Sequence, residues 1–452
     1  MTAFPAKVAA ARAAAGLSRR TRAGGGTTLP GKLLLRMAPD AIERMARRLA
    51  EGSVVISATN GKTTTAKMLA SMLSPERHLC RNTAGANLSS GVASALLACP
   101  GADLGVFEVD EAALPGVAHA LRPHVTVLGN LFRDQLDRYG ELEAIASRWQ
   151  QMTAELPGDA RLVRNGDDPL LASLEHTGPT LTFGIDDPAA ALPAMPHASD
   201  SKWCPACGTR LAYTHVYLGH LGAWSCPNCG RRRPPLDVTA TALVPQGLDG
   251  TRFELRTPIG AARVRLPMPG LYNVYNALTA AAAACAVGGV DIDRIAAGLE
   301  RFDAAFGRFE RLRVGDRDAV LLLAKNPAGA NELIRTLAAD ARPKQLLLAL
   351  NDRIADGRDV SWIWDVDFEL LAGNVQEVVT AGTRAAEMAM RLKYGGVEPE
   401  RLIVAGGIAE ALDRALAGGE GPVYLLGTYT AMLELRAVLT RRGVVRPYWE
   451  AA

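Results

Sequence analysis

The residues with the clearest chemistry form one run near the N-terminus, Ala58-Thr-Asn-Gly-Lys-Thr-Thr-Thr65. An apolar, strand-like stretch precedes this run, and a helical pattern follows it as far as Leu73. Strand, turn and helix in this order form the layout of a phosphate-binding loop, in which backbone N–H groups and a helix N-terminus face the phosphates. The strict pattern is broken at Ile56, which stands where a first Gly is expected. The run predicts ATP binding through Thr59, Asn60, Gly61, Lys62, Thr63 and Thr64.

Charged and hydroxyl side chains around the loop could complete a nucleotide site. Lys62 offers a point charge for the outer phosphates, and the Thr63 hydroxyl suits Mg²⁺, which prefers hard oxygen ligands. We expect the Lys62 side chain to face solvent, so that replacing it by Ala costs little stability. The run Phe107-Glu-Val-Asp-Glu111 ends another strand-like stretch and adds three carboxylates. Such carboxylates beside a phosphate loop can hold Mg²⁺, and solvated surface acids are the alternative.

Four of the seven cysteines form two pairs with metal-ligand spacing. The pairs are Cys204-Pro-Ala-Cys207-Gly and Cys226-Pro-Asn-Cys229-Gly, and 18 residues separate them. This spacing is typical of a zinc ribbon, and four thiolates leave no position for a reacting water, so the zinc would be structural. Disulfides are the alternative, which a cytoplasmic chain makes improbable. Three arginines follow at 231–233; they could contact nucleic acid, but a solvated edge is the more common role.

Length and composition restrict the class of protein. A chain of 452 residues suggests about three domains. The net charge of +3 gives no argument for nucleic acid as a partner. The N-terminus is not a convincing signal peptide, and the apolar stretch at 277–290 is too short to span a bilayer, so we expect a cytoplasmic protein. The first 20 residues could form a basic amphipathic helix at a membrane surface, or a helix packed on its own domain.

Short apolar strands alternate with helical stretches along most of the chain, which predicts an α/β fold with mostly parallel sheets. We expect an N-terminal helical segment at 1–50, broken near Gly25, and an ATP-binding domain at 51–312. The cysteine cluster would be an insertion in that domain at about 200–234. A smaller α/β domain would occupy 313–452. The expected strands lie at 104–109, 125–129, 319–324, 345–350, 375–380 and 423–427.

Three motifs in this order resemble the Mur ligase superfamily. They are the phosphate loop, Asn165-Gly-Asp-Asp-Pro169 and Gly270-Leu-Tyr-Asn-Val-Tyr-Asn276. The resemblance implies a Mur ligase-like central ATPase domain followed by a Rossmann-like C-terminal domain. It also implies that Asn273 lies near the adenine, that Glu108 coordinates Mg²⁺, and that an amine is joined to a carboxylate by way of an acyl phosphate.

Several departures narrow the resemblance to one branch of the superfamily. Gln135 stands where amino-acid-adding members have His, Lys325 stands where they have another His, and no Lys that could be carbamylated lies between Lys67 and Lys202. One branch of the superfamily has these same departures. This chain also resembles that branch at residues 26–32, 130–140 and 356–365 and in the four-cysteine insertion. Its members pair with a GatD-like glutaminase subunit and amidate the α-carboxyl of D-glutamate in lipid II at the membrane surface. The chain has no Cys/His pair of its own for hydrolysing glutamine, which also implies a partner.

One Asp of the C-terminal domain has an expected role in that partnership. In the resembling branch, such an Asp completes the glutaminase's Cys-His pair, where it would orient the imidazole. Asp352, Asp356 and Asp359 all follow the strand at 345–350, and we favour Asp356 because Gly357 gives the loop room. Ordinary loop acids are the alternative. Two other functions also stay open: a Mur-like or folylpolyglutamate-like ligase that adds an amino acid, and a non-catalytic scaffold that binds ATP or nucleic acid.

Overall fold

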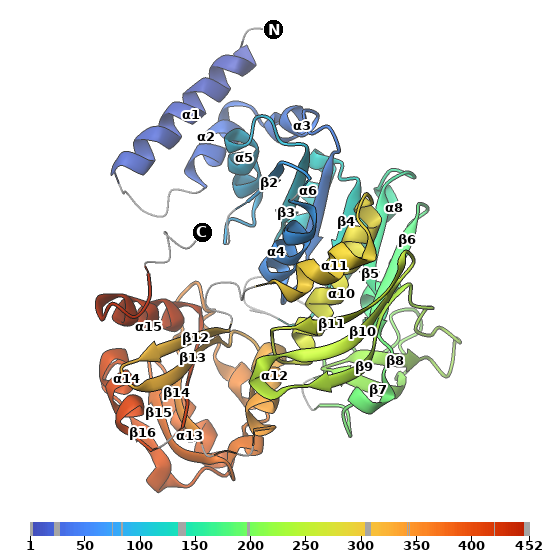
Figure 1. Ribbon diagram of the computed structural model, residues 1–452. Helices are drawn as coiled ribbons and strands as arrows, with labels where there is room; N and C mark the ends of the chain where they lie inside the picture. Colours follow the sequence, from blue (N-terminus) through green and yellow to red (C-terminus); the bar gives the residue numbers. More distant parts are fainter. Residues whose placement is uncertain are drawn as a thin grey trace.

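The computed structural model describes residues 3–21, 28–74, 76–82, 85–133, 142–196, 199–302, 309–340, 342, 344–419 and 421–446. Within them lie a nine-stranded sheet, a six-stranded sheet and a two-stranded hairpin (Figure 1). The sheets occupy the central and C-terminal parts of the chain, as the alternation of strands and helices predicts. Across the described residues, no helix has both the length and the apolar character needed to cross a membrane.

The large sheet has the order β11-β10-β9-β6-β5-β4-β1-β3-β2. It is parallel from β2 to β9, and β9, β10 and β11 are antiparallel to one another. The strands are β1 (Ser53–Ser57), β2 (Leu79–Arg81), β3 (Leu104–Glu108), β4 (Val125–Leu128), β5 (Arg161–Asn165), β6 (Thr180–Ile185), β9 (Val238–Pro245), β10 (Thr251–Thr257) and β11 (Gly260–Leu266). Because β1 lies between β3 and β4, the polar residues that follow these three strands meet at one edge of the sheet.

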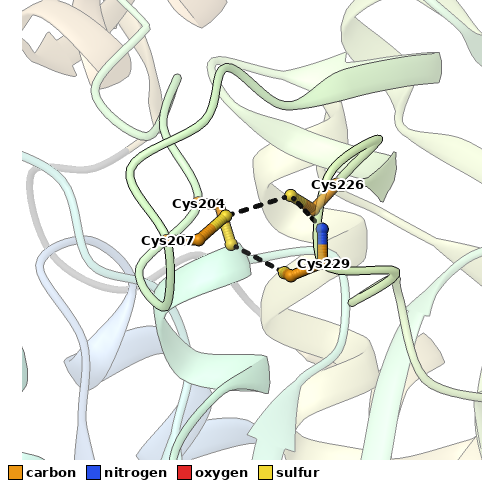
Figure 2. Close-up of side chains that lie close together, drawn as sticks. All are labelled: Cys204, Cys207, Cys226 and Cys229. Atoms are coloured by element: carbon orange, nitrogen blue, oxygen red, sulfur yellow. Dashed lines mark hydrogen bonds between the residues drawn. The ribbon is translucent and has the colours of Figure 1, made fainter.

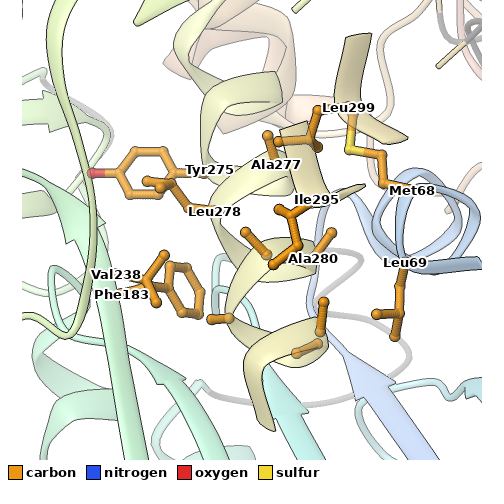
Figure 3. Close-up of a cluster of buried hydrophobic side chains, with 14 of the residues drawn as sticks. Met68, Leu69, Phe183, Val238, Tyr275, Ala277, Leu278, Ala280, Ile295 and Leu299 are labelled. Carbon is orange, nitrogen blue, oxygen red and sulfur yellow. The ribbon is translucent and has the colours of Figure 1, made fainter. Parts of the chain in front are cut away.

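Helices cover both faces of this sheet, since alternate strand residues point to opposite faces. Val54 and Ile56 pack toward α4, α10 and α11, whereas Val55 packs toward the N-terminal helices. The Ala-rich α10 lies close to the sheet, beside Met68, Phe183 and Val238 (Figure 3). These helices are α1 (Ala3–Thr21), α2 (Leu29–Met37), α3 (Ala41–Ala46), α4 (Lys62–Leu73), α5 (Ser89–Ala98), α6 (Leu114–Leu121), α8 (Leu142–Glu155), α9 (Pro169–Ala172), α10 (Leu271–Val287) and α11 (Ile292–Glu300).

The N-terminal helix α1 packs on its own domain. Val8 and Ala11 are buried against α2 and α5, and the Lys7 ammonium donates a hydrogen bond to the carbonyl of Met37 at 2.6 Å. This agrees with the simpler of the two interpretations of the basic N-terminus. The glycine-rich break expected near Gly25 lies outside the described residues.

The C-terminal sheet has the order β12-β13-β17-β14-β15-β16, with β12 antiparallel to β13 and the other strands parallel. Helices α12 and α13 cover one face, and α14 and α15 cover the other. The elements are β12 (Glu310–Val314), β13 (Arg317–Leu323), α12 (Pro327–Ala338), β14 (Lys344–Ala349), β15 (Val375–Ala381), α13 (Ala385–Tyr394), β16 (Leu402–Val404), α14 (Ile408–Ala417), β17 (Val423–Gly427) and α15 (Tyr429–Arg441). The four strands expected in this domain are confirmed, and β12 and β16 are additional.

The insertion between β6 and β9 holds the two-stranded hairpin of β7 (Ala212–Leu218) and β8 (Leu221–Ser225). One Cys pair precedes β7, and the other follows β8. The hairpin therefore brings both pairs to its open end.

Candidate functional site

The phosphate-binding loop connects β1 to α4, as the sequence predicts. Gly61 is the residue before α4 and has φ of +92°. A Cβ atom at this position would lie 1.8 Å from the amide oxygen of Asn276 on α10. Glycine is therefore required both by the backbone conformation and by the close approach of Asn276. Asn276 belongs to a motif singled out in the sequence, but its position over the loop could not be predicted from spacing.

Side chains from the segment after β4 hold the loop in shape. The backbone N–H of Asn60 donates to the Asn130 side chain at 2.9 Å, and the Asn130 amide donates to the carbonyl of Asn60 at 2.9 Å. The Thr59 hydroxyl exchanges hydrogen bonds of 3.0 and 3.1 Å with the backbone of Phe132. These bonds fix the loop before any ligand arrives. Because the loop is already ordered, binding of a ligand costs less conformational entropy.

Lys62 lies inside the protein, so the expectation of a solvent-facing side chain is wrong. Its ammonium is 3.1 Å from a carboxylate oxygen of Glu111, and the two side chains are only 10% and 7% exposed. The ammonium also donates to the carbonyl of Ala58. The pairing arises because β3, which leads to Glu111, is the neighbour of β1. Removal of Lys62 would leave a buried carboxylate without its counter-charge.

Glu108 has the environment expected of a cation ligand. It ends β3 opposite Ile56, and Asn82 binds its backbone N–H and C=O at 3.0 and 2.8 Å. Within the described residues, the Oε2 atom of Glu108 is buried and has no hydrogen-bond partner. A buried carboxylate oxygen without a partner is costly unless a cation compensates it. Glu108, together with the half-buried Thr63 in the first turn of α4, therefore fits a hard cation such as Mg²⁺.

A pocket extends from the loop into the space between the two sheet domains. Gly61 and Thr64 line one end, and Asn273 of α10 lines a wall. Asn326 of the C-terminal domain also lines the pocket and exchanges hydrogen bonds of 3.0 and 3.4 Å with the Asn60 side chain. The same Asn326 caps α12 by accepting from a backbone N–H of its first turn at 2.9 Å. The C-terminal domain thus contacts the phosphate loop directly, through a residue that no sequence motif assigns to the site.

Asn273 is held at the start of α10. Its amide nitrogen donates to the carbonyl of Pro269 at 2.7 Å, and its oxygen accepts from Asn276 at 3.2 Å. The structure therefore brings Asn273 into the pocket that starts at the phosphate loop.

The Asn-Gly-Asp-Asp-Pro motif anchors neighbouring segments. Asp167 is fully buried and accepts from Arg233 at 3.1 Å and from the Tyr275 hydroxyl at 2.7 Å. Burial raises the pKa of Asp167 above its ordinary value, and the Arg233 charge opposes that rise. Asp168 caps α9 and accepts from the N–H of Leu131, in the segment that holds the phosphate loop. Arg233 is thus part of a buried ion pair, which accounts for one of the three consecutive arginines.

The four cysteines converge as their spacing predicts, and Figure 2 shows their side chains pointing toward one another. Their sulfur atoms all lie within 4.8 Å of one another, with Cys204 and Cys229 3.6 Å apart and Cys207 and Cys226 3.5 Å apart. A disulfide would require about 2.05 Å. The sulfurs of a tetrahedral zinc site, with Zn–S bonds of about 2.3 Å, are about 3.8 Å apart. The geometry therefore fits a zinc ion.

The three candidate acids of the C-terminal domain differ in environment. Asp356 is 4% exposed, and its two oxygens accept from the N–H of Thr430 at 2.7 Å and from the hydroxyl of the same residue. Asp352 is paired with Arg384 at 2.7 Å, and hydrogen bonds from neighbouring side chains lower its pKa. Asp359 is exposed and binds the N–H of Ser361. Of the three, Asp356 is the most buried.

Gln135, which stands where amino-acid-adding Mur ligases have His, lies outside the described residues, as do all residues from 134 to 140. Lys325, the other departure, lines the interdomain pocket beside Asn326.

Comparisons with known proteins agree with this architecture. The sequence model of the family "Mur ligase middle domain" matches residues 56–204, and that of the family "MurT ligase C-terminal" matches residues 323–432. A solved pseudomurein peptide ligase type C from Methanothermus fervidus has a similar fold. Its TM-score is 0.69 at 24% identity, over 87% of this chain and 79% of that chain.

Fold and site together define an ATP-dependent ligase of the Mur type. Over 432 residues, the chain is 34% identical to the MurT subunit of the glutamine-hydrolysing lipid II isoglutaminyl synthase of Streptococcus pneumoniae, covering 94% of this chain and 95% of the relative. The corresponding subunit of Staphylococcus aureus is 30% identical over 92% of this chain and 93% of the relative. The chain belongs to the MurT family.

Proposed function

We propose that this protein amidates the α-carboxyl of D-glutamate in the stem peptide of lipid II, at the cytoplasmic face of the membrane, with ammonia supplied by a GatD-like glutaminase subunit. The observation that carries the proposal is the phosphate loop, closed over by Asn276 and contacted by the C-terminal domain through Asn326. This arrangement suits a reaction in which ATP and a carboxylate substrate meet between two domains. The relatives of this chain are subunits of a lipid II isoglutaminyl synthase.

The site residues can supply the first half of the reaction. A carboxylate is a poor acyl donor, and transfer of the γ-phosphoryl group of ATP would give it a leaving group as an acyl phosphate. Lys62 would stabilise the outer phosphates, and a bound phosphate would compete with Glu111 for its ammonium. Mg²⁺ held by Thr63 and Glu108 would neutralise charge on the phosphates. Asn273 would lie against the adenine, farther along the same pocket.

The second half needs ammonia, which attacks the acyl carbon and displaces phosphate. Ammonia is protonated in bulk water, so delivery from a bound glutaminase is an advantage. Asp356 would orient the histidine of that partner. Its hydrogen bonds to Thr430 use two of its roughly four lone-pair positions and leave others for an imidazole. Ile354, which is 74% exposed, and Tyr429 give the same loop region apolar contacts for a partner.

The four-cysteine insertion would hold one structural Zn²⁺ through Cys204, Cys207, Cys226 and Cys229. The near-tetrahedral spacing of their sulfurs supports this assignment. The zinc would fold the insertion and take no part in the chemistry, because four thiolates fill its coordination shell.

The test is a reconstituted reaction with lipid II, ATP and Mg²⁺, with ammonium salts, glutamine or amino acids as nitrogen donors, followed by mass spectrometry of the lipid. We expect amidated lipid II with ammonium alone, and with glutamine only when the glutaminase is present. Transfer of an amino acid in place of ammonia would instead identify an amino-acid-adding ligase.

A further inference from the structure

The tip of the β7–β8 hairpin reaches the nucleotide pocket, far along the hairpin from the cysteines. Leu218 ends β7 and Leu221 begins β8, and the two face each other across the turn. Both are almost fully buried, at 4% and 1% exposed, and both line the pocket that Gly61 and Asn273 also line. At the other end of the hairpin, the first residue of β7 pairs with the last residue of β8, next to Cys226. The insertion therefore has a metal-binding end and a pocket end.

The turn between the two leucines is fixed against the central domain. Gly219 has φ of +57°, and His220, the next residue, is fully buried. The His220 Nε2 atom is 3.5 Å from a carboxylate oxygen of Asp168, and its ring centroid is 4.8 Å from that of Phe132. Phe132 is the residue whose backbone binds Thr59 of the phosphate loop. The hairpin tip and the phosphate loop are thus positioned by the same segment.

The second strand of the hairpin is docked on the Asn-Gly-Asp-Asp-Pro motif. The N–H of Gly222 donates to the carbonyl of Asp167 at 3.0 Å. The Trp224 indole donates to the carbonyl of Gly166 at 3.1 Å. Trp224 also packs with two of the four cysteines in the small core of the insertion. The docking contacts therefore connect the cysteine end of the hairpin to its tip.

We propose that the β7–β8 hairpin forms the apolar wall that contacts the adenine ring of ATP, with Leu218 and Leu221 as the residues that set affinity for the base. The proposal rests on the ATP site proposed above and extends it to the insertion. The flat faces of adenine need apolar contacts, whereas the phosphates need the N–H groups and charge of the loop. Leu218 and Leu221 supply such contacts in the pocket that Asn273 lines. The insertion would thus be a part of the nucleotide site and not a separate module.

The test compares two probes that share phosphates but differ in the base. The full-length protein, together with any subunit that co-purifies, is titrated calorimetrically with MgATP and with magnesium tripolyphosphate. We expect Leu218→Ala and Leu221→Ala each to weaken MgATP binding about tenfold, which corresponds to about 1.4 kcal/mol of lost apolar contact. Tripolyphosphate binding should stay within about twofold of the wild-type value, because it does not need the base wall.

Two further variants control for damage to the fold. Leu221→Met conserves volume and apolar character, so MgATP affinity should return close to that of the wild type. Leu243→Ala makes the same truncation in the core of the same domain, outside the pocket, and should lower thermal stability without changing either affinity.

Each outcome has a defined meaning. MgATP affinities of the hairpin variants that equal those of Leu243→Ala would overturn the proposal. Equal losses for MgATP and tripolyphosphate would also overturn it, because they would reflect a damaged phosphate loop. If the wild-type protein bound no MgATP, the proposed function itself would fail, which is a separate result.

Discussion

Replacement of Asp356 by Asn should separate a role in the partner's active site from a role in the fold. The Asp356 carboxylate accepts two hydrogen bonds from Thr430, in the first turn of α15. An Asn at this position keeps one oxygen for the Thr430 N–H, and its amide group can donate to the hydroxyl. What is lost is the negative charge near a helix N-terminus, which is worth about 0.3–1 kcal/mol.

Asp356→Ala is a harsher change, because it leaves the Thr430 N–H without a side-chain partner. We expect a cost of about 1–3 kcal/mol for that loss. In a domain of this size, each kcal/mol lowers the melting temperature by roughly 3–5 °C. Scanning calorimetry should therefore show a clear shift for Asp356→Ala and a small one for Asp356→Asn.

The activity assay uses the complex with the proposed glutaminase subunit and measures amidation of lipid II with glutamine or with ammonium. A triad Asp orients the imidazole and stabilises its charged form, so Asp356→Asn should reduce glutamine-dependent amidation on the order of 10³–10⁴-fold. Ammonium-dependent amidation should persist, since the phosphate loop is untouched. Asp352→Asn is the matched control, because Asp352 lies in the same loop but is paired with Arg384. We expect it to keep both activities.

Two results would refute this reasoning. A parallel loss of both activities in Asp356→Asn, with an unchanged melting temperature, would place Asp356 in the synthetase site. Full retention of both activities would exclude Asp356 from the triad, and Asp359 would then be the next residue to replace.

Three more predictions concern the loop, the interdomain contact and the metal. Lys62→Ala should abolish amidation and also cost about 3–5 kcal/mol by orphaning Glu111; adding Glu111→Gln should restore the melting temperature but not the activity, and amidation by either variant would disprove the assigned role of Lys62. Asn326→Ala removes both the bonds to Asn60 and the cap of α12, so denaturant unfolding should show a loss of about 1–2 kcal/mol, and an unchanged midpoint would contradict the contact. Metal analysis should find one zinc ion per chain, and much less in Cys207→Ser; a wild-type value near zero would rule out the ribbon.

The parts of the site that sequence could predict are those encoded locally. The phosphate loop is a strand, a turn and a helix within about 20 consecutive residues, and the cysteine pairs have spacing that only a few structures use. The burial of Lys62 was not predictable, because it depends on β3 lying beside β1 and bringing Glu111 to the loop. The contact between Asn60 and Asn326 joins residues 266 positions apart. No local pattern encodes such a pairing.

The fold shows the same division between local and long-range information. β17 is a continuous apolar run and β14 contains one at 346–349; such runs are typical of buried parallel strands and predict the positions of both. β16 (Leu402–Val404) is also apolar, but it is only three residues long and partly exposed, which is shorter than the run of four to eight residues that indicates a strand. The order of strands in either sheet depends on how the helices pack and could not be derived from periodicity.

The position of β17 has a consequence for how the chain is made. It is the last strand of the C-terminal sheet in the sequence, yet it lies between β13 and β14. A chain leaves the ribosome N-terminus first. The edges of β13 and β14 that pair with β17 therefore stay unpaired until residues 423–427 have been synthesised. The helix that fixes Asp356, α15, follows directly. A partner that contacts the Asp356 loop would therefore assemble only with chains in which residues 423–441 have already been synthesised.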